Sequence, residues 1–205
     1  GVASLFDPWQ LNGLNEDEIK AAVKVASNYG SYVAAHSYTK DSITRALNMG
    51  VKTIEHGFEF DGDIAKLMEE KGAYLVTQMT SMAPGLADDP ALQDPRTARK
   101  LKSAQEAFKG FVANVKKYKP KFGFQTDVVG DPEAAIRQIG YEKHLHAKFF
   151  GNFHMLKAAT STAGEIVALC GPVINPYAEG KLGVVEAGAY ADLLLVDGNP
   201  LEDVG

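Results

Sequence analysis

A repeated unit of helix, glycine and short apolar run fills the first part of the chain and constrains its fold more than any other feature. Three helix-like stretches each close on a glycine and are each followed by an apolar run, at residues 14–30 then 32–36, 40–50 then 51–57, and 61–72 then 73–79. In the first helix, Asn15 and Glu18 have the capping-box spacing and Gly30 stands at the end, where these residue types are favoured. The runs do not alternate, as expected of parallel strands with both faces covered. The sequence therefore predicts an α/β fold of successive parallel βα units.

The second half continues this pattern after an interruption. Residues 80–95 contain three prolines among several Asp, Ser and Thr residues, which predicts a long loop, either a lid over a substrate site or a plain surface excursion. A long helix is expected at 96–118 and a fourth strand at 119–127. Two more helices are expected at 131–150 and 152–169.

The tail of the chain differs in character. Two β-favouring runs, at 182–186 and 191–197, flank a glycine-containing turn, which predicts a small antiparallel β appendage. The sequence thus divides into a βα part at 1–170 and an appendage at 171–205.

Charge and cysteine content narrow the classes of partner. The net charge is −5 and the sequence pI is about 5.5, without a basic patch, so we expect neither nucleic acid nor an anionic membrane as a partner. No apolar run approaches the roughly 20 residues of a membrane helix. The single cysteine, Cys170, excludes an internal disulfide and favours a reducing, cytoplasmic compartment. The chain opens without a methionine, which leaves a targeting segment, and so the compartment, open.

Two histidines and an aspartate stand at the ends of predicted strands. His36 ends the first strand, His56 the second and Asp127 the fourth. In a barrel of parallel βα units, catalytic groups come from the C-terminal ends of the strands, which share one mouth. Neutral imidazole is a zinc ligand, and a carboxylate can bind metal or act as a general base. Position alone leaves two interpretations open, a metal site and ordinary packed residues.

Four stretches resemble the amidohydrolase superfamily, in the branch that contains imidazolonepropionase-like proteins and Xaa-Pro dipeptidases (prolidases). They are VAAHSY, VKTIEHG, FQTDV and GKLGVVEAGAYADLLLVDGNPLEDV, in the family's order over nearly the whole chain. The resemblance implies strands five to eight, the C-terminal half, of a TIM-type (β/α)8 barrel, plus the last strands of a small composite β domain. It also implies a missing N-terminal half. That half or self-association into a homo-oligomer would cover the open sheet edges.

The resemblance also implies roles for four residues. His36 and His56 match the metal-binding histidines of the fifth and sixth barrel strands. Asp127 matches the aspartate of the eighth strand, which binds metal and shuttles a proton. Tyr38 matches a tyrosine that helps to hold the substrate in the dipeptidase branch. The implied cofactor is a divalent metal, with zinc favoured and one or two ions in the complete enzyme.

The implied activity is hydrolysis of a C–N bond in a small molecule, either an Xaa-Pro type dipeptide or an N-acyl amino acid. The alternatives are a deaminase or cyclic-imide hydrolase on the same scaffold, and an inactive chain that needs its N-terminal half. This chain departs from the family in two ways. Gln125 stands where the family usually has glycine, and the first-strand His-x-His and fourth-strand lysine are absent.

Other polar residues are expected to have structural roles. His144 and His146 form a literal His-x-His pair, but positions two apart on a helix diverge by about 200°, so they are expected to be surface or packing residues. Glu55 should point to the opposite face of its strand from the neighbouring histidine and serve as a hydrogen-bond partner. Trp9 is compatible with the core or with a pocket wall.

Overall fold

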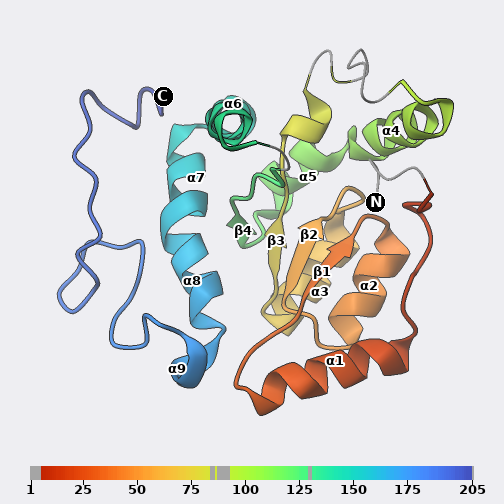
Figure 1. The fold of residues 1–205 in the computed structure, drawn as a ribbon, viewed down its shortest axis with the longest axis horizontal. Helices are drawn as coiled ribbons and strands as arrows, with labels where there is room; N and C mark the ends of the chain where they lie inside the picture. The colour runs from red at the N-terminus through yellow and green to blue at the C-terminus, as the bar shows by residue number, and fades with distance from the viewer. Residues whose placement is uncertain (1–5, 84–85, 87–92, 129–130, 205) are drawn as a thin grey trace.

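Four parallel strands form the centre of the molecule, with helices around them (Figure 1). The structure, a computed structural model, describes residues 6–83, 86, 93–128 and 131–204. The strands are β1 (Ala34–Ser37), β2 (Thr53–His56), β3 (Tyr74–Val76) and β4 (Phe122–Gly123). They pair in the order β1-β2-β3-β4, and each pair is parallel. The predicted α/β fold of parallel units is therefore confirmed.

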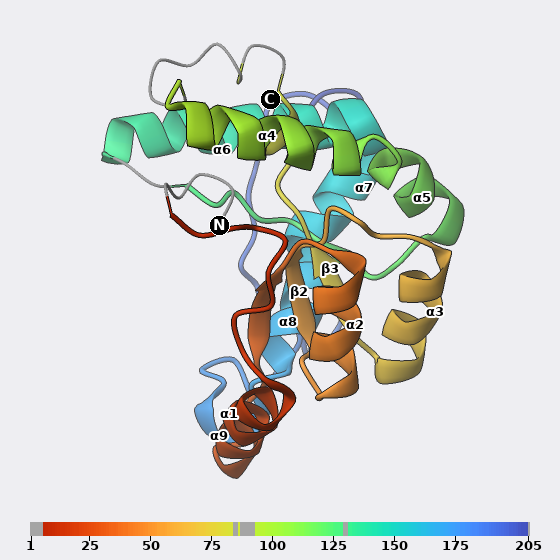
Figure 2. The same ribbon diagram turned by 90° about the vertical axis from the view of Figure 1, so that its right-hand side faces the viewer.

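Helices connect the strands, and further helices come after the last strand in the chain. They are α1 (Glu16–Asn28), α2 (Lys40–Asn48), α3 (Gly62–Lys71), α4 (Pro95–Phe108), α5 (Phe111–Tyr118), α6 (Pro132–Phe150), α7 (Asn152–Lys157), α8 (Ala163–Ala168) and α9 (Gly171–Ile174). A π-helical turn, Ala158–Thr162, joins α7 to α8. Figure 2 shows α2 and α3 beside the sheet, with α4 and α6 crossing over one end of it. Among the described residues, no helix is both long and apolar enough to cross a lipid bilayer.

The helix ends follow local rules that the sequence shows. The predicted capping box of Asn15 and Glu18 is present at the start of α1. Gly72 closes α3 with a left-handed backbone at φ 61°, which glycine adopts without steric cost. Helix α2 begins after Thr39, whose side chain accepts from Ser42 N, and Asp41 lies inside its first turn.

Three predicted elements differ from the structure. The helix expected at 96–118 is divided between α4 and α5 at Lys109 and Gly110, where glycine lowers helix propensity. The fourth strand is only two residues long. The described tail forms no strand at 182–186 or 191–197, because no other described strand lies beside these runs to accept their backbone hydrogen bonds.

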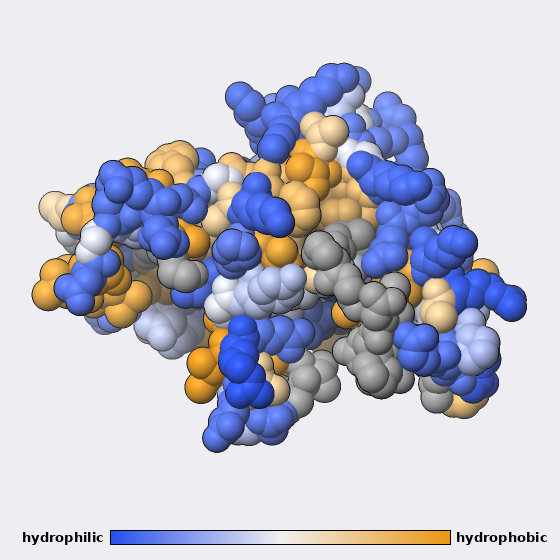
Figure 3. Space-filling view, turned by 90° about the horizontal axis from the view of Figure 1, so that it is seen from above, coloured by the Kyte–Doolittle hydropathy of each residue, from blue (hydrophilic) through white to orange (hydrophobic). Residues whose placement is uncertain are grey.

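The two faces of the sheet have different surroundings. On one face Ile54, Leu75 and Phe122 are at most 3% exposed and belong to the main apolar core, which also contains residues of α2, α3 and α5. On the other face Ala34 and His36 of β1 are exposed. Apolar side chains of the tail are exposed too, at Val185, Leu194 and Leu195, and hydrophobic residues show at the left of Figure 3, where the tail lies.

The loop expected at 80–95 is described only in part. A 3₁₀ turn at Thr80–Met82 follows β3, and α4 begins at Pro95. Residues 84–85 and 87–92 lie outside the described residues, so the choice between a lid and a surface excursion stays a prediction.

Candidate active site

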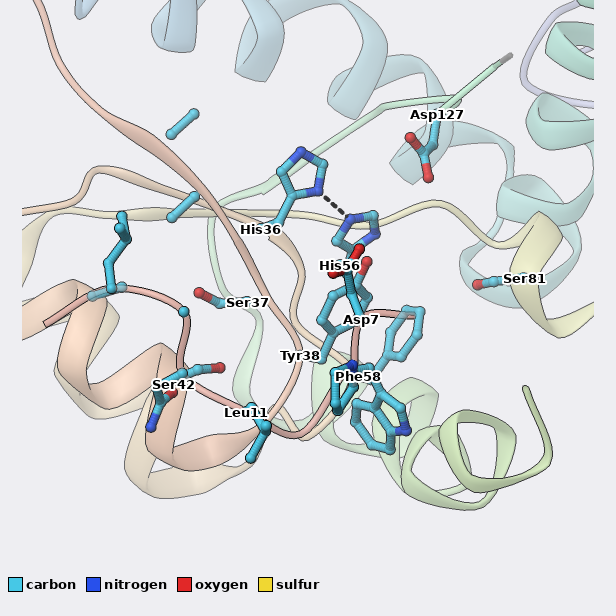
Figure 4. A pocket seen from close by; sticks show the side chains of 18 of the residues that line it. Asp7, Leu11, His36, Ser37, Tyr38, Ser42, His56, Phe58, Ser81 and Asp127 are labelled. Carbon is cyan, nitrogen blue, oxygen red and sulfur yellow. Dashed lines mark hydrogen bonds between the residues drawn. The ribbon is translucent and has the colours of Figure 1, made fainter. Parts of the chain in front are cut away.

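His36 and His56 meet at the carboxyl end of the sheet. In the register of β1 and β2, His36 pairs with Glu55 and Ser37 pairs with His56, so regular alternation would put the two imidazoles on opposite faces. His56, however, has φ 72°, a left-handed backbone that is uncommon for a residue with a Cβ. This turn ends β2, and His56 Nε2 lies 2.6 Å from His36 Nδ1 (Figure 4). The two strand-end histidines are thus neighbours through a backbone turn that the sequence pattern does not reveal.

The imidazole of His56 is almost completely buried. Its side chain is 2% exposed, and the Tyr38 ring stacks on it with centroids 4.4 Å apart and planes 9° from parallel. Its Nδ1 lies 3.0 Å from Gln78 Oε1. Burial lowers the pKa of His56 to about 4, so near neutral pH the ring is uncharged, the form that binds metal ions.

Gln78 connects the histidine pair to the aspartate. It follows β3 and is 6% exposed, and its Nε2 lies 3.4 Å from Asp127 Oδ2. Gln125 donates its Nε2 to the Val76 carbonyl and to Gln78 Oε1, each at 2.9 Å. Because an ionised carboxylate only accepts hydrogen bonds, the contact with Asp127 places the amide nitrogen of Gln78 on that side and its oxygen towards His56.

Among the described residues, Asp127 forms no hydrogen bond with either imidazole, although the sequence places it in the same ligand set. It has φ 48°, is exposed, and contacts Gln78, which in turn contacts His56. Across the described ranges, no three His, Cys, Asp or Glu side chains lie close enough together to hold a metal ion. The structure therefore brings His36 and His56 together and places Asp127 in the same cavity without completing a three-ligand site.

The chemistry of the two imidazoles nevertheless fits a metal such as zinc. His36 Nδ1 and His56 Nε2 face each other at 2.6 Å, and His56 is held neutral by burial. Tetrahedral zinc with bonds of 2.0–2.1 Å would set two ligand nitrogens about 3.3 Å apart. A small opening of the pair would satisfy that distance.

A cavity of about 1110 Å³ surrounds this site, large enough for a small organic molecule. His36, Tyr38, His56, Gln78 and Asp127 line it together with apolar side chains. Its apolar walls include Trp9, Leu11, Leu14, Phe58 and Leu101. Trp9 is 5% exposed and meets Tyr38 edge-on, with ring centroids 6.0 Å apart, so this residue is both a core residue and a wall of the cavity.

Among the described residues, those expected to be structural make no hydrogen bond with the facing ring nitrogens of His36 and His56. Glu55 pairs with His36 in the register of β1 and β2, so both lie on the same face of the sheet. Burial raises the pKa of Glu55, and a hydrogen bond with Thr53 opposes that rise. On α6, His144 is exposed and His146 is fully buried, as divergence around a helix requires. Neither of these two is among the residues that line the cavity.

Sequence reasoning missed the role of Gln78. It is the second-last residue of the third apolar run, at 73–79, so it lies close to a strand end, as the two histidines do. That position was the available signal. Its amide was overlooked because it is not itself a common metal ligand or catalytic acid.

Comparisons with known proteins identify the family to which the chain is similar. A sequence profile described as "Amidohydrolase family" matches residues 1–204. Ochratoxinase from Aspergillus niger is 28% identical over 217 residues, covering 100% of this chain and 40% of that protein. The solved structure of a prolidase complexed with N-methylphosphonate-L-proline has a TM-score of 0.80 and 36% identity, covering 100% of this chain and 48% of that one. A Xaa-Pro dipeptidase with bound methionine shares the fold, with a TM-score of 0.81 at 24% identity and the same coverage of 100% and 48%. The chain thus spans less than half the length of each of these relatives.

Proposed function

Because this chain belongs to the amidohydrolase family, we propose that the complete protein is a metal-dependent hydrolase of C–N bonds. The observation that carries the proposal is the approach of His36 Nδ1 and His56 Nε2 at the ends of adjacent parallel strands. Strand ends are the usual place for catalytic groups in barrels of this type. Asp127 lies at the end of the run that follows β4 and faces the same cavity.

The proposed substrate class is an Xaa-Pro type dipeptide or an N-acyl amino acid. Two observations support it. One is that a structural relative, at 36% identity, is a prolidase complexed with a phosphonate derivative of L-proline. The cavity combines apolar walls at Trp9, Leu11 and Phe58 with polar groups near the histidine pair, as expected for a small substrate with one apolar part.

In this proposal each residue of the site has a separate task. His36 and His56 would hold the metal through Nδ1 and Nε2. A bound zinc ion would supply Lewis acidity at the scissile carbonyl and would lower the pKa of a water molecule. Asp127 would accept the proton of the attacking water and return it to the leaving nitrogen. Tyr38, stacked on His56, would donate a hydrogen bond to the carboxylate or the developing oxyanion of the substrate.

The test is a set of substitutions in the full-length protein. His36→Ala and His56→Ala should each remove bound zinc, and Asp127→Asn should lower turnover of an Xaa-Pro dipeptide more than about 10³-fold while zinc is retained. The matched control is His144→Ala, because His144 is exposed on α6 and should change neither quantity. Zinc is measured by elemental analysis and turnover on a panel of dipeptides, N-acyl amino acids and cyclic imides. Unchanged zinc content in His56→Ala would refute the proposed metal site.

A further inference from the structure

The side-chain amide of Gln78 contacts both candidate groups of the site, His56 and Asp127. A second amide, that of Gln125, donates a hydrogen bond to its oxygen. We propose that Gln78, supported by Gln125, is a positioning residue that fixes the orientation and the tautomer of His56. This inference rests on the proposed function, because it concerns how His56 is prepared to bind a metal. Gln78 itself is assigned no contact with the substrate.

The tautomer follows from hydrogen-bond donors and acceptors. The oxygen of the Gln78 amide can only accept, so the Nδ1 of His56, 3.0 Å away, must carry the hydrogen. In a neutral imidazole the other nitrogen then has the free lone pair. That nitrogen, Nε2, is the atom that faces His36 Nδ1 at 2.6 Å. An outer partner of this kind orients a histidine ligand and makes it more basic.

Gln78 is itself held rigidly. Gln125 donates to its Oε1 at 2.9 Å and also to the carbonyl of Val76, the last residue of β3. The two residues that follow Gln78 are fixed as well, because Glu142 of α6 accepts from the backbone N–H of Met79 and of Thr80, the latter at 2.8 Å. Glu142 is fully buried. The amide is therefore clamped from its side chain and from its backbone.

Gln125 provides a second hydrogen-bond donor to the amide oxygen of Gln78. The amide nitrogen of Gln125 donates to Gln78 Oε1 at 2.9 Å. The same oxygen faces His56 Nδ1, so Gln125 adds a donor on the far side of the acceptor that His56 uses. A purely space-filling side chain at position 125 would not supply that donor.

The experiment reads the tautomer directly. Full-length protein labelled with ¹⁵N-histidine is stripped of metal, and the ring nitrogens of His56, assigned with His56→Ala, are measured by NMR. The wild-type protein and Gln78→Glu, which keeps an oxygen acceptor, should show a protonated Nδ1. Gln78→Leu should lose that preference, and its zinc affinity in a competition titration should fall about 10–100-fold. The matched control is Asn114→Leu, which removes the hydrogen bond that Asn114 Nδ2 donates to the Phe60 carbonyl. Asn114 does not line the cavity, so this variant should change neither readout.

The outcomes separate this inference from the proposed function. Unchanged tautomer and zinc affinity in Gln78→Leu would overturn the positioning role while leaving the hydrolase proposal standing. A tautomer shift in a protein whose wild-type form neither binds zinc nor hydrolyses any substrate would support the role of Gln78 and refute the hydrolase. If Gln78→Leu does not fold, Gln125→Gly carries the test. A smaller shift of the same kind supports the inference, and an unchanged His56 spectrum overturns it.

Discussion

Two buried histidines in this molecule, His56 and His146, differ in the hydrogen-bond partners of their ring nitrogens. His56 has a neighbour at each ring nitrogen. His146 is equally buried, but its Nδ1 has no hydrogen-bond partner among the described residues, and its Nε2 lies 3.2 Å from His154 Nδ1. The His146 ring stacks on Phe122, with centroids 5.1 Å apart. It is therefore a packing residue, in agreement with the sequence prediction.

The first prediction concerns acid stability. Burial lowers the pKa of His146 from 6.5 to about 3. The unfolded chain takes up the proton first. The contribution of His146 to the free energy of unfolding is therefore constant above pH 6.5, and it is lost as the pH falls from 6.5 to the folded pKa. Between pH 7 and pH 5 this residue should cost about 2 kcal/mol. His146→Phe should remove that loss in urea denaturation at the two pH values. His154, whose pKa burial also lowers, is present in both proteins.

The exposed His144 provides the comparison. His144→Gln should leave the pH dependence of the free energy of unfolding as it is in the parent protein. Equal acid sensitivity of His146→Phe and the parent would show that the His146 proton is not what destabilises the fold.

Local chemistry made the histidine pair partly predictable. His36 and His56 could be found because strand ends and residue type are visible in the sequence. The left-handed turn at His56 could not, because only a small fraction of histidines adopt that backbone and the turn depends on the packed surroundings. The network of Gln78, Gln125 and Asp127 depends on contacts between separate units, which no local pattern records.

At the scale of elements, starts and stops were predicted best where a single residue decides them. The capping box at Asn15 and the left-handed Gly72 are of this kind. The division of α4 from α5 was missed because the apolar stripe runs on through it. Both residues at the break keep right-handed helical angles, so the division is a bend and not a full stop.

Two glycines in the same molecule should respond oppositely to alanine. Gly110 has φ −84° and ψ −14°, and a Cβ there would meet only Asn114 Nδ2 at 3.6 Å. Gly110→Ala should therefore stabilise the protein by about 0.5–1 kcal/mol, chiefly by restricting the unfolded chain. Urea denaturation measures the change, and a lower stability would show that the bend needs glycine.

Gly57 is the matched opposite case. Its φ is +60°, and a Cβ would lie 2.4 Å from Leu75 Cδ1. Gly57→Ala should destabilise the protein by about 1–3 kcal/mol. Since Gly57 follows His56 directly, the same variant should also weaken zinc binding if the strain is relieved by moving that histidine.

At the scale of the whole molecule, the sheet and the tail both have surfaces without neighbours. Ala34 and His36 are exposed on the inner face of the sheet, and Leu193, Leu194 and Leu195 of the tail are 68%, 92% and 103% exposed. The β runs of the tail were predicted as strands from composition, but a strand forms only beside a partner. The relatives are more than twice as long as this chain, which covers 40% and 48% of two of them. We propose that the other half supplies these partners, and that the boundary at residue 170 separates barrel from appendage.

The last prediction follows from those open surfaces. Residues 1–205 on their own should retain zinc weakly and turn over substrate negligibly. Two imidazole ligands, without further ligands from the rest of the barrel, cannot hold the metal in a fixed geometry. The exposed apolar groups should also drive self-association. The test is to express residues 1–205 alone and together with the N-terminal half that the family resemblance implies, then to measure zinc by elemental analysis, hydrolysis on the same substrate panel, and mass by light scattering. Zinc binding and hydrolysis should return only in the combined sample. A monomer of residues 1–205 with one zinc ion per chain and turnover of about 1–10³ per second would contradict this, since it would show that half of the barrel is sufficient for the site.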